Sequence, residues 1–509
     1  MPANSTPLHT TGRVAAVDLA AYSPITAANT LANAGAPIVG FCVASCKAGQ
    51  RMSVVTTGTA EAWAGGAISD GALVQVGSGG TVVAATAGGR AIGRAMNAAA
   101  AAGDKVEVLL FAANEAGLGV TKNNATGLNV LDDASRLAAT APSCVYNLKR
   151  SNMSNWITAR DSANAGGRPT ILMVGDSTFA GAGAGTAGTT AMVGAKQRNV
   201  ETKLAQALKK LGIPARGGHF CGNNNVIGAS GITYDGTAGT SYSTQLAYTG
   251  TAVWNQQTLG VLMLRLNATG EKASWTPTHS FDTITITYVR NAGLSSATVD
   301  VDGGASLGTI NANGAGAVMT ATFTCTEGTH TVNITNQANA QFYIRSIKCS
   351  SSSRGCVDIL TAAHWGGLVA DFNGTTNPWS PGNVMGVDGQ KLTIVKLMTN
   401  DVNGATSLAT YQSGMETLIG RIKSAGSDVL LMSADPFNSA NYNNGKAATF
   451  IACLRDTLAV NFDCPFIDLD SYFGPWGEQR VGYYYDSLHP AEALYAEEGD
   501  LLARVLAAV

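Results

Sequence analysis

The pattern of apolar and polar positions changes several times along the 509-residue chain. Residues 1–120 contain short β-like segments separated by glycine, among them MSVVTTG, GALVQVGSGGTVVAAT and DKVEVLLF. This pattern predicts a small all-β domain with many turns. Residues 121–165 are polar and irregular, which is typical of a linker. From residue 166 onward a different pattern begins.

Apolar runs alternate with amphipathic segments in the rest of the chain, and this alternation predicts a parallel sheet covered by helices on both faces. ILMVGDS is a continuous apolar run that ends at a turn, as a buried parallel strand does. Residues 197–211 have an apolar face at helical spacing, and a final helix is expected at 490–509. We therefore expect a three-layer, flavodoxin-like α/β domain built from residues 166–250 and 353–509.

The segment between these two parts, residues 251–352, has a period of two. FDTITITYVR alternates apolar residues with threonines, and further short β-like segments follow at hairpin spacing. The pattern predicts an antiparallel β-sandwich inserted into the α/β domain. Sandwiches of this kind often bind carbohydrate, which is an analogy at the level of the fold.

Composition and charge narrow the possible partners. Charged residues make up 13% of the chain and the formal net charge is -2, so we expect no nucleic-acid partner. The N-terminus has no signal-peptide pattern and no apolar run is long enough to span a membrane, so we expect a soluble protein without a signal peptide or membrane contact. The nine cysteines form no C-x-x-C pair and are expected to be mostly reduced core residues.

Ser177 is the first candidate for chemistry. It lies in Gly175-Asp176-Ser177 at the carboxyl end of the first predicted α/β strand, where open parallel sheets bind their ligands. A serine at this sharp turn is expected to be exposed, and the N–H groups of the following helix can face a developing oxyanion. The same three residues would also suit a simple helix cap.

The segment Asp486-Ser487-Leu488-His489 favours the catalytic interpretation. Its D-x-x-H spacing can bring a carboxylate to one ring nitrogen of His489 while the other nitrogen faces Ser177. None of the other five histidines has this context. We therefore predict a Ser177–His489–Asp486 triad, the alternative being that His489 is an exposed polar residue before a helix.

With G-D-S near its first strand and D-x-x-H near its C-terminus, the chain resembles the SGNH (GDSL-like) hydrolases. Their third block, G-x-N-D, corresponds to Met398-Thr399-Asn400-Asp401, so the resemblance implies that Asn400 donates its amide to the oxyanion. Met398 replaces the glycine of that block, and as an alternative Asn400 is only a loop cap. For the second block we predict that Gly366 supplies a backbone N–H beside that of Ser177, with Gly231 as the alternative. The resemblance implies serine ester hydrolysis without a metal or an organic cofactor.

The N-terminal domain resembles capsid-decoration and head-fibre domains of tailed phages, which share its order of a GALV strand, a GRAIGRAM strand, an alanine run and a closing GDKVEVLL strand. This resemblance implies a virion protein made in the host cytoplasm, bound to capsid or other virion proteins and oligomeric, for which we expect a trimer. The alternative is a generic glycine-rich oligomerisation domain.

Together the two resemblances predict a virion-associated esterase that removes short acyl groups, above all acetyl, from bacterial surface polysaccharide. A catalytically inactive structural or adhesive virion protein is the main alternative. A cellular lipase or thioesterase is a third possibility, which the N-terminal domain disfavours.

Overall fold

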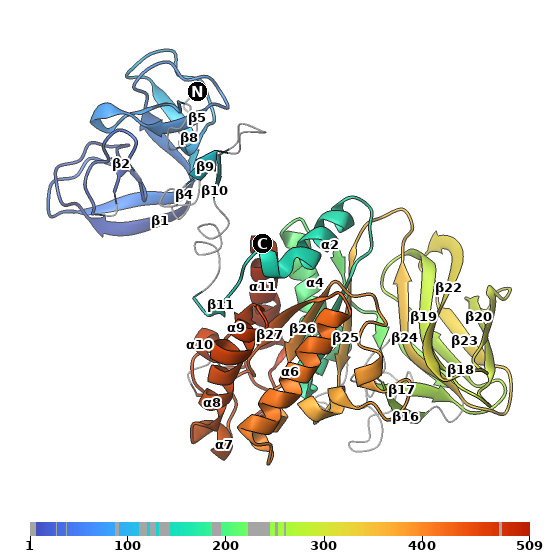
Figure 1. The fold of residues 1–509 in the computed structure, drawn as a ribbon. Coiled ribbons are helices and arrows are strands. Elements are labelled where there is room, and N and C mark those ends of the chain that lie inside the picture. Colours follow the sequence, from blue (N-terminus) through green and yellow to red (C-terminus); the bar gives the residue numbers. More distant parts are fainter. Residues whose placement is uncertain are drawn as a thin grey trace. The chain divides into compact units, whose positions relative to one another are not determined.

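The chain folds into two compact units, Met1–Thr140 and Ala141–Val509. Both contain sheets, and the second also contains helices, so the protein is multidomain with mixed α and β structure (Figure 1). No helix among the described residues is long and apolar enough to cross a membrane. The computed structural model describes residues 7–26, 28–36, 38–86, 91–110, 120–122, 129–131, 143–185, 195–221, 245–249, 253–258, 261–477 and 481–509.

The first unit is built from antiparallel strands. They are β1 (Pro7–Val14), β2 (Pro24–Ile25), β3 (Gly40–Cys42), β4 (Arg51–Trp63), β5 (Leu73–Val76), β6 (Val82–Ala84), β7 (Ala91–Ala95), β8 (Lys105–Leu110) and the hairpin β9 (Val120–Lys122) and β10 (Asn129–Leu131). The main sheet has the order β2-β3-β4-β8-β7-β5-β6, and β1 pairs with β4. Alternate residues of β4 and β8, such as Ala62, Val106 and Val108, are buried in one core. The segments that the sequence predicts as strands form β4 to β8.

A mostly parallel sheet of seven strands forms the centre of the second unit. Its strands are β11 (Val145–Tyr146), β12 (Thr170–Gly175), β13 (Ala215–Arg216), β25 (Val357–Ala363), β26 (Leu392–Lys396), β27 (Asp428–Met432) and β28 (Phe466–Ile467). Their order is β11-β28-β27-β26-β12-β25-β13, and only β11 is antiparallel to its neighbour. Every residue of β12, β25, β26 and β27 is buried, because helices cover both faces. The five strands β25-β12-β26-β27-β28 follow the 2-1-3-4-5 order of doubly wound sheets.

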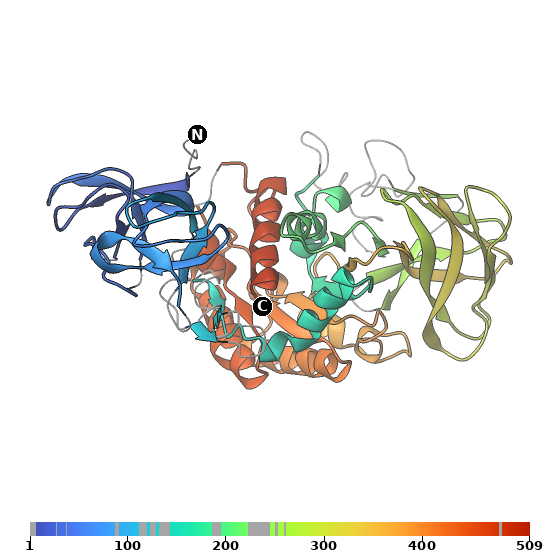
Figure 2. The same cartoon turned by 90° about the horizontal axis from the view of Figure 1, so that it is seen from above.

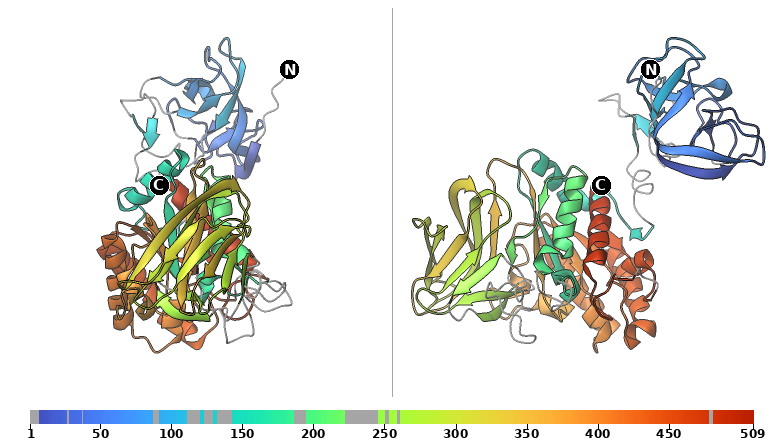
Figure 3. Two further views of the ribbon diagram at one scale, coloured as in Figure 1. Left: turned by 90° about the vertical axis from the view of Figure 1, so that its right-hand side faces the viewer. Right: turned by 180° about the vertical axis from the view of Figure 1, so that it is seen from behind.

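Helices α4 (Val200–Lys210) and α11 (Glu492–Ala508) pack against each other on one face of this sheet (Figures 2 and 3). The opposite face shares a core with α6 (Leu408–Ser424) and with the helical stretch of α8 (Lys446–Ala452), a π-helical turn (Cys453–Leu458) and α9 (Ala459–Asn461). Shorter helices are α3 (Ser177–Ala180), α5 (Thr399–Asn403), α7 (Ala440–Asn443) and α10 (Leu469–Phe473). The layers are therefore helix, sheet and helix.

Two antiparallel sheets lie between β13 and β25 in the sequence (Figure 3). The first has the order β16-β17-β24-β19-β22, and its strands are β16 (Val253–Thr258), β17 (Val261–Leu266), β19 (Phe281–Arg290), β22 (Ala317–Gly328) and β24 (Phe342–Ser350), with β14 (Phe220–Cys221) paired to β24. The second has the order β15-β18-β23-β20-β21, and its strands are β15 (Leu246–Thr249), β18 (Lys272–Trp275), β20 (Ser296–Val301), β21 (Gly308–Asn311) and β23 (Val332–Asn336). The period-two segment 251–352 thus forms strands as expected, but strand pairing already begins at β14 and β15.

The predicted linker 121–165 extends further than the structure supports. Its last part forms β11 and α2 (Ser154–Asn164), which belong to the second unit. Trp156 anchors α2, because its indole N–H donates to the Leu506 carbonyl at 2.9 Å and its backbone N–H donates to Asp428 Oδ2 at 2.9 Å. Only Trp156, Ala159 and Ala163 of this polar helix are buried, so its apolar periodicity is too weak to predict a helix.

Candidate active site

Ser177 lies directly after the central strand β12, as the first residue of α3. Asp176 caps this one-turn helix, because its Oδ1 accepts hydrogen bonds from the Thr178 N–H at 2.9 Å and from Thr178 Oγ1 at 2.8 Å. The cap fixes the turn that carries the serine. Ser177 is only 2% exposed, so the expectation of an exposed serine is wrong. It is enclosed because the ring of His489 lies against its hydroxyl.

The structure brings Ser177, His489 and Asp486 together. Ser177 Oγ lies 3.2 Å from His489 Nε2, and His489 Nδ1 lies 2.8 Å from Asp486 Oδ2. The ionised carboxylate of Asp486 can only accept hydrogen bonds. The neutral ring of His489 therefore carries its hydrogen on Nδ1 and leaves Nε2 free to accept from the serine hydroxyl. This is the arrangement in which a histidine takes a proton from a nucleophilic hydroxyl.

Local backbone geometry holds Asp486 in position. Its Oδ1 accepts hydrogen bonds from the backbone N–H groups of Leu488 and His489, both at 2.7 Å. Partial burial acts to raise the pKa of Asp486, but the hydrogen bonds from the His489 ring and from the two N–H groups lower this pKa below its ordinary value overall. The carboxylate therefore stays ionised beside the imidazole and favours a positive charge on it.

Asn400 and Gly366, predicted to bind an oxyanion, lie on neighbouring loops. Asn400 is in α5, after β26, and its Nδ2 donates to the Gly367 carbonyl at 3.2 Å. This bond uses one of the two amide hydrogens. Gly366 follows β25 in an exposed turn with φ +71°, a conformation that favours glycine. Both loops extend from the strands that flank β12, and Gly231, the alternative to Gly366, lies outside the described residues.

Two further residues contact His489 and were not singled out from the sequence. The ring of Trp365 meets the His489 ring edge to face, with centroids 5.3 Å apart, and Trp365 is 40% exposed. Gly183 has φ +91°, and a Cβ at this position would lie 2.2 Å from the Pro490 carbonyl oxygen and 3.1 Å from His489 Cβ. Only glycine therefore lets this segment approach the histidine so closely. The repeated GAGAG letters after Ser177 are a weak signal of it.

A buried charged cluster lies close to α3. Lys396 Nζ lies 2.7 Å from Asp435 Oδ2, 2.9 Å from Glu498 Oε1 and 5.0 Å from the ring centroid of Phe179 in α3. Burial and the charge of Asp435 outweigh the effect of Lys396 and raise the pKa of Glu498 to about 8. The cluster ties β26 to α11, the helix that follows His489, and so supports the position of the histidine.

The described part of the chain contains no cluster of three or more His, Cys, Asp or Glu residues arranged to hold a metal ion. All nine cysteines are free, and seven of them are buried.

Comparison with known proteins relates the two units to different groups. Residues 9–110 match the phage cement protein family. This match covers the main sheet of the first unit and makes that unit similar to a virion component. The N base of the head fibre gp8.5 of bacteriophage phi29 is 17% identical over 20% of this chain and 93% of its own, with a TM-score of 0.18. No curated protein matches the chain.

Solved structures similar to half or more of the chain include esterases. A peptidoglycan O-acetylesterase is 14% identical, with a TM-score of 0.52, and the similarity covers 71% of this chain and 97% of that one. It shows a common fold. A family two carbohydrate esterase from Clostridium thermocellum in complex with cellohexaose is 12% identical over 51% of this chain and 97% of its own, with a TM-score of 0.24.

Proposed function

We propose that the second unit is a serine ester hydrolase of the SGNH type, with Ser177 as nucleophile, His489 as general base and acid, and Asp486 as the carboxylate that orients the histidine. The observation that carries this proposal is the continuous contact from Ser177 Oγ to His489 Nε2 at 3.2 Å and from His489 Nδ1 to Asp486 Oδ2 at 2.8 Å. If Ser177 served only to begin a helix, its hydroxyl would not need to meet a histidine 312 residues away in the sequence.

The reaction then proceeds through an acyl-enzyme. Ser177 Oγ attacks the ester carbonyl while its proton passes to His489 Nε2, and the imidazolium returns this proton to the leaving alcohol as the C–O bond breaks. A water molecule attacks the acyl group with His489 again as base, releasing the acid and free Ser177. Asp486 stabilises the imidazolium in both steps without taking its proton.

The oxyanion of each tetrahedral intermediate needs hydrogen-bond donors. We assign this role to the backbone N–H groups of Ser177 and Gly366 and to the second amide hydrogen of Asn400. The bond from Asn400 Nδ2 to the Gly367 carbonyl supports this assignment, because it holds the amide against the loop that contains Gly366. The three donors come from segments that follow β12, β25 and β26, at the topological switch point of the sheet.

As substrate we propose short acyl groups, above all acetyl, on a bacterial surface polysaccharide. The fold shared with a peptidoglycan O-acetylesterase supports an ester on a glycan. The match of residues 9–110 to the phage cement protein family supports attachment to a virion through the first unit, with capsid proteins as partners. A trimer remains our expectation for the assembly.

Hydrolysis of p-nitrophenyl acetate by the purified full chain tests the activity. We expect Ser177→Ala to reduce kcat by about 10⁴-fold or more, since the nucleophile is lost. Ser487→Ala is the matched control, because Ser487 is an exposed serine two residues before His489. Butyrate and longer esters measured alongside should be cleaved more slowly than acetate. Equal activity in wild type and Ser177→Ala would refute the proposal.

A catalytically inactive virion component is the second candidate, and the phage cement match of residues 9–110 is the observation that favours it. A serine-directed fluorophosphonate distinguishes the two functions. An active triad predicts stoichiometric labelling that is absent in Ser177→Ala, whereas an inactive adhesive protein predicts no labelling of either protein.

A further inference from the structure

Two adjoining cavities lie where the α/β layers meet the antiparallel sheets of the second unit. Their volumes are about 280 and about 360 Å³, and both are lined by Lys209, Arg216 and His279. The smaller one also borders Cys356, at the amino end of β25, whereas Ser177 follows the carboxyl end of the parallel strand β12. The cavities are therefore separate from the candidate active site. Each has the size of a site for a small ligand or for part of a longer one.

The lining of both cavities is cationic. Lys209, Arg216 and Arg354 line the smaller cavity, and the larger one adds Lys196, which is paired with the buried Glu201. No aspartate or glutamate is among the described residues that line either cavity. A concave surface with charges of one sign favours a ligand of the opposite sign.

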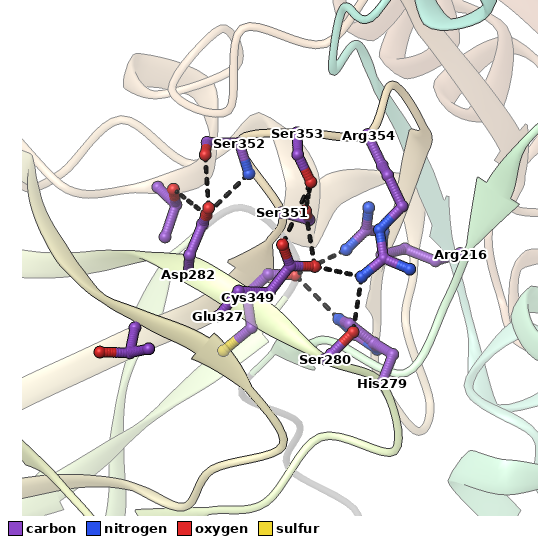
Figure 4. A network of polar contacts seen from close by, with 12 residues as sticks. Arg216, His279, Ser280, Asp282, Glu327, Cys349, Ser351, Ser352, Ser353 and Arg354 are labelled. Atoms are coloured by element: carbon purple, nitrogen blue, oxygen red, sulfur yellow. Dashed lines mark hydrogen bonds and ion pairs between the residues drawn. The ribbon is translucent and has the colours of Figure 1, made fainter.

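Arg216 is held firmly in this wall. Its Nε lies 3.3 Å from Oδ1 of the buried Asp358, and Oδ2 of the same carboxylate lies 3.8 Å from Lys348 Nζ. Two cations thus share one negative charge. Arg354, the second arginine of the smaller cavity, contacts the carboxylate of Glu327 and the hydroxyl of Ser280 (Figure 4).

Lys209 lies in the last turn of α4, and its side chain forms no hydrogen bond or ion pair with any described residue. Of the cations that line the cavities, Arg216 is paired with Asp358 and Arg354 with Glu327, and neither carboxylate is among the described lining residues. Lys196, Lys209, Arg216 and Arg354 are the charged side chains among the described lining residues, whereas the whole chain has a formal charge of -2. An excess of positive charge is concentrated at this place.

His279 adds a neutral polar group to the same wall. Burial, together with the neighbouring His219, lowers the pKa of His279 to about 4, so its ring is uncharged at neutral pH. Its Nε2 lies 2.9 Å from the Cys349 carbonyl oxygen and must carry the hydrogen, which leaves Nδ1 as an acceptor (Figure 4). An acceptor of this kind suits a hydroxyl group.

We propose that the joined cavities bind an anionic saccharide, through a sugar unit that carries a carboxylate. Lys209, Arg216 and Arg354 receive the carboxylate, and His279 and Ser280 bind sugar hydroxyls. Such a site holds a polysaccharide chain apart from Ser177 and raises the local concentration of its esters. The choice of a glycan as ligand rests on the proposed function, but binding itself does not require hydrolysis.

Calorimetric titration of the full chain with trigalacturonate at low ionic strength tests this site, with the neutral trisaccharide maltotriose and inorganic phosphate as comparison ligands. We expect trigalacturonate to bind and maltotriose to bind at least about ten-fold more weakly. Lys209→Glu should weaken trigalacturonate binding by about ten-fold or more. Lys210→Glu, the same charge change at the next residue of α4, does not alter the lining and should change affinity less than about two-fold.

Three results would overturn the inference: no binding of trigalacturonate, equal loss of affinity in Lys209→Glu and Lys210→Glu, or binding of phosphate without binding of trigalacturonate. The hydrolysis of p-nitrophenyl acetate, measured on the same proteins, should be unchanged in Lys209→Glu. Esterase activity without saccharide binding would refute this inference alone. Saccharide binding without any esterase activity would refute the proposed function, but the inference of a saccharide site would stand.

Discussion

The second unit contains several histidine–aspartate pairs, and two of them, His489–Asp486 and His219–Asp358, differ in whether they meet a nucleophile. His489 Nδ1 bonds Asp486 at 2.8 Å and its Nε2 reaches Ser177, whereas His219 Nε2 lies 3.2 Å from Asp358 and its buried Nδ1 has no partner among the described residues. Each histidine also meets another ring edge to face, Trp365 in one case and His279 in the other. Both histidines therefore bond a carboxylate through one ring nitrogen and contact one further aromatic ring.

The difference lies in the surroundings of the carboxylate. Asp486 is 42% exposed at its side chain and receives two local backbone N–H groups, so it can stabilise a histidine whose charge changes during a reaction. Asp358 is completely buried and is already compensated by Arg216 and Lys348. Removing one partner of such a buried carboxylate leaves an uncompensated charge and destabilises the fold. A histidine–aspartate pair indicates catalysis only where its free ring nitrogen faces a nucleophile.

The comparison is tested most strongly by the same substitution in both histidines. We expect His489→Gln to lower kcat for p-nitrophenyl acetate by about 10⁴-fold, because the general base is lost. We expect His219→Gln to leave kcat within about three-fold and to lower the free energy of unfolding by about 1–3 kcal/mol, because Asp358 loses a buried partner. Esterase kinetics and urea unfolding measure the two effects. A folded His219→Gln protein without activity would contradict the separation of roles.

The second prediction concerns the donors that distinguish the catalytic pair from the structural one. Asn400→Ala should lower kcat by about 10²- to 10³-fold with little change in KM, as expected when one oxyanion donor is removed. Asn403→Ala is the control, since Asn403 is the exposed last residue of the same helix α5. If both variants lose activity equally, Asn400 acts only through the stability of α5.

Features formed by residues close together in the sequence could be predicted. Asp486 and His489 are three residues apart, so their spacing predicts the contact, and the run ILMVGDS predicts the strand and turn that carry Ser177. The catalytic roles of these residues, of Gly366 and of Asn400 remain predictions.

Apart from the contact between Ser177 and His489, which the two motifs and the family resemblance predicted, contacts between distant segments could not be predicted. His219 and Asp358 meet across 139 residues of sequence, and the approach of Gly183 to His489 depends on the path of the chain after α3. The helix α2 was not predicted for a related reason, because Trp156 ties it to the distant residues Asp428 and Leu506. Long-range packing of this kind leaves no periodic signal in the sequence.

The third prediction extends the comparison to a buried carboxylate next to the active site. The pKa of Glu498 is raised by burial from 4.5 to about 8, so the folded state holds this proton more tightly than the unfolded state. The resulting stability is present at low pH and is lost as the pH rises toward and through about 8. Between pH 6 and 9 we expect the wild type to lose about 2 kcal/mol more unfolding free energy than Glu498→Gln. Asp500→Asn, an exposed site on α11, should follow the wild type in urea unfolding at each pH.

The smallest expected effect belongs to the ring beside the catalytic histidine. Trp365 is 40% exposed and its ring meets the His489 ring edge to face, so it can contact a substrate as well as support the imidazole. If it binds sugar, Trp365→Phe and Trp365→Ala should raise KM for an acetylated oligosaccharide, by about two-fold and about ten-fold, while kcat for p-nitrophenyl acetate stays within about two-fold. If it only positions His489, Trp365→Ala should lower kcat for both substrates equally and leave KM unchanged. The split between KM and kcat thus decides whether the contact of Trp365 with His489 serves recognition or packing.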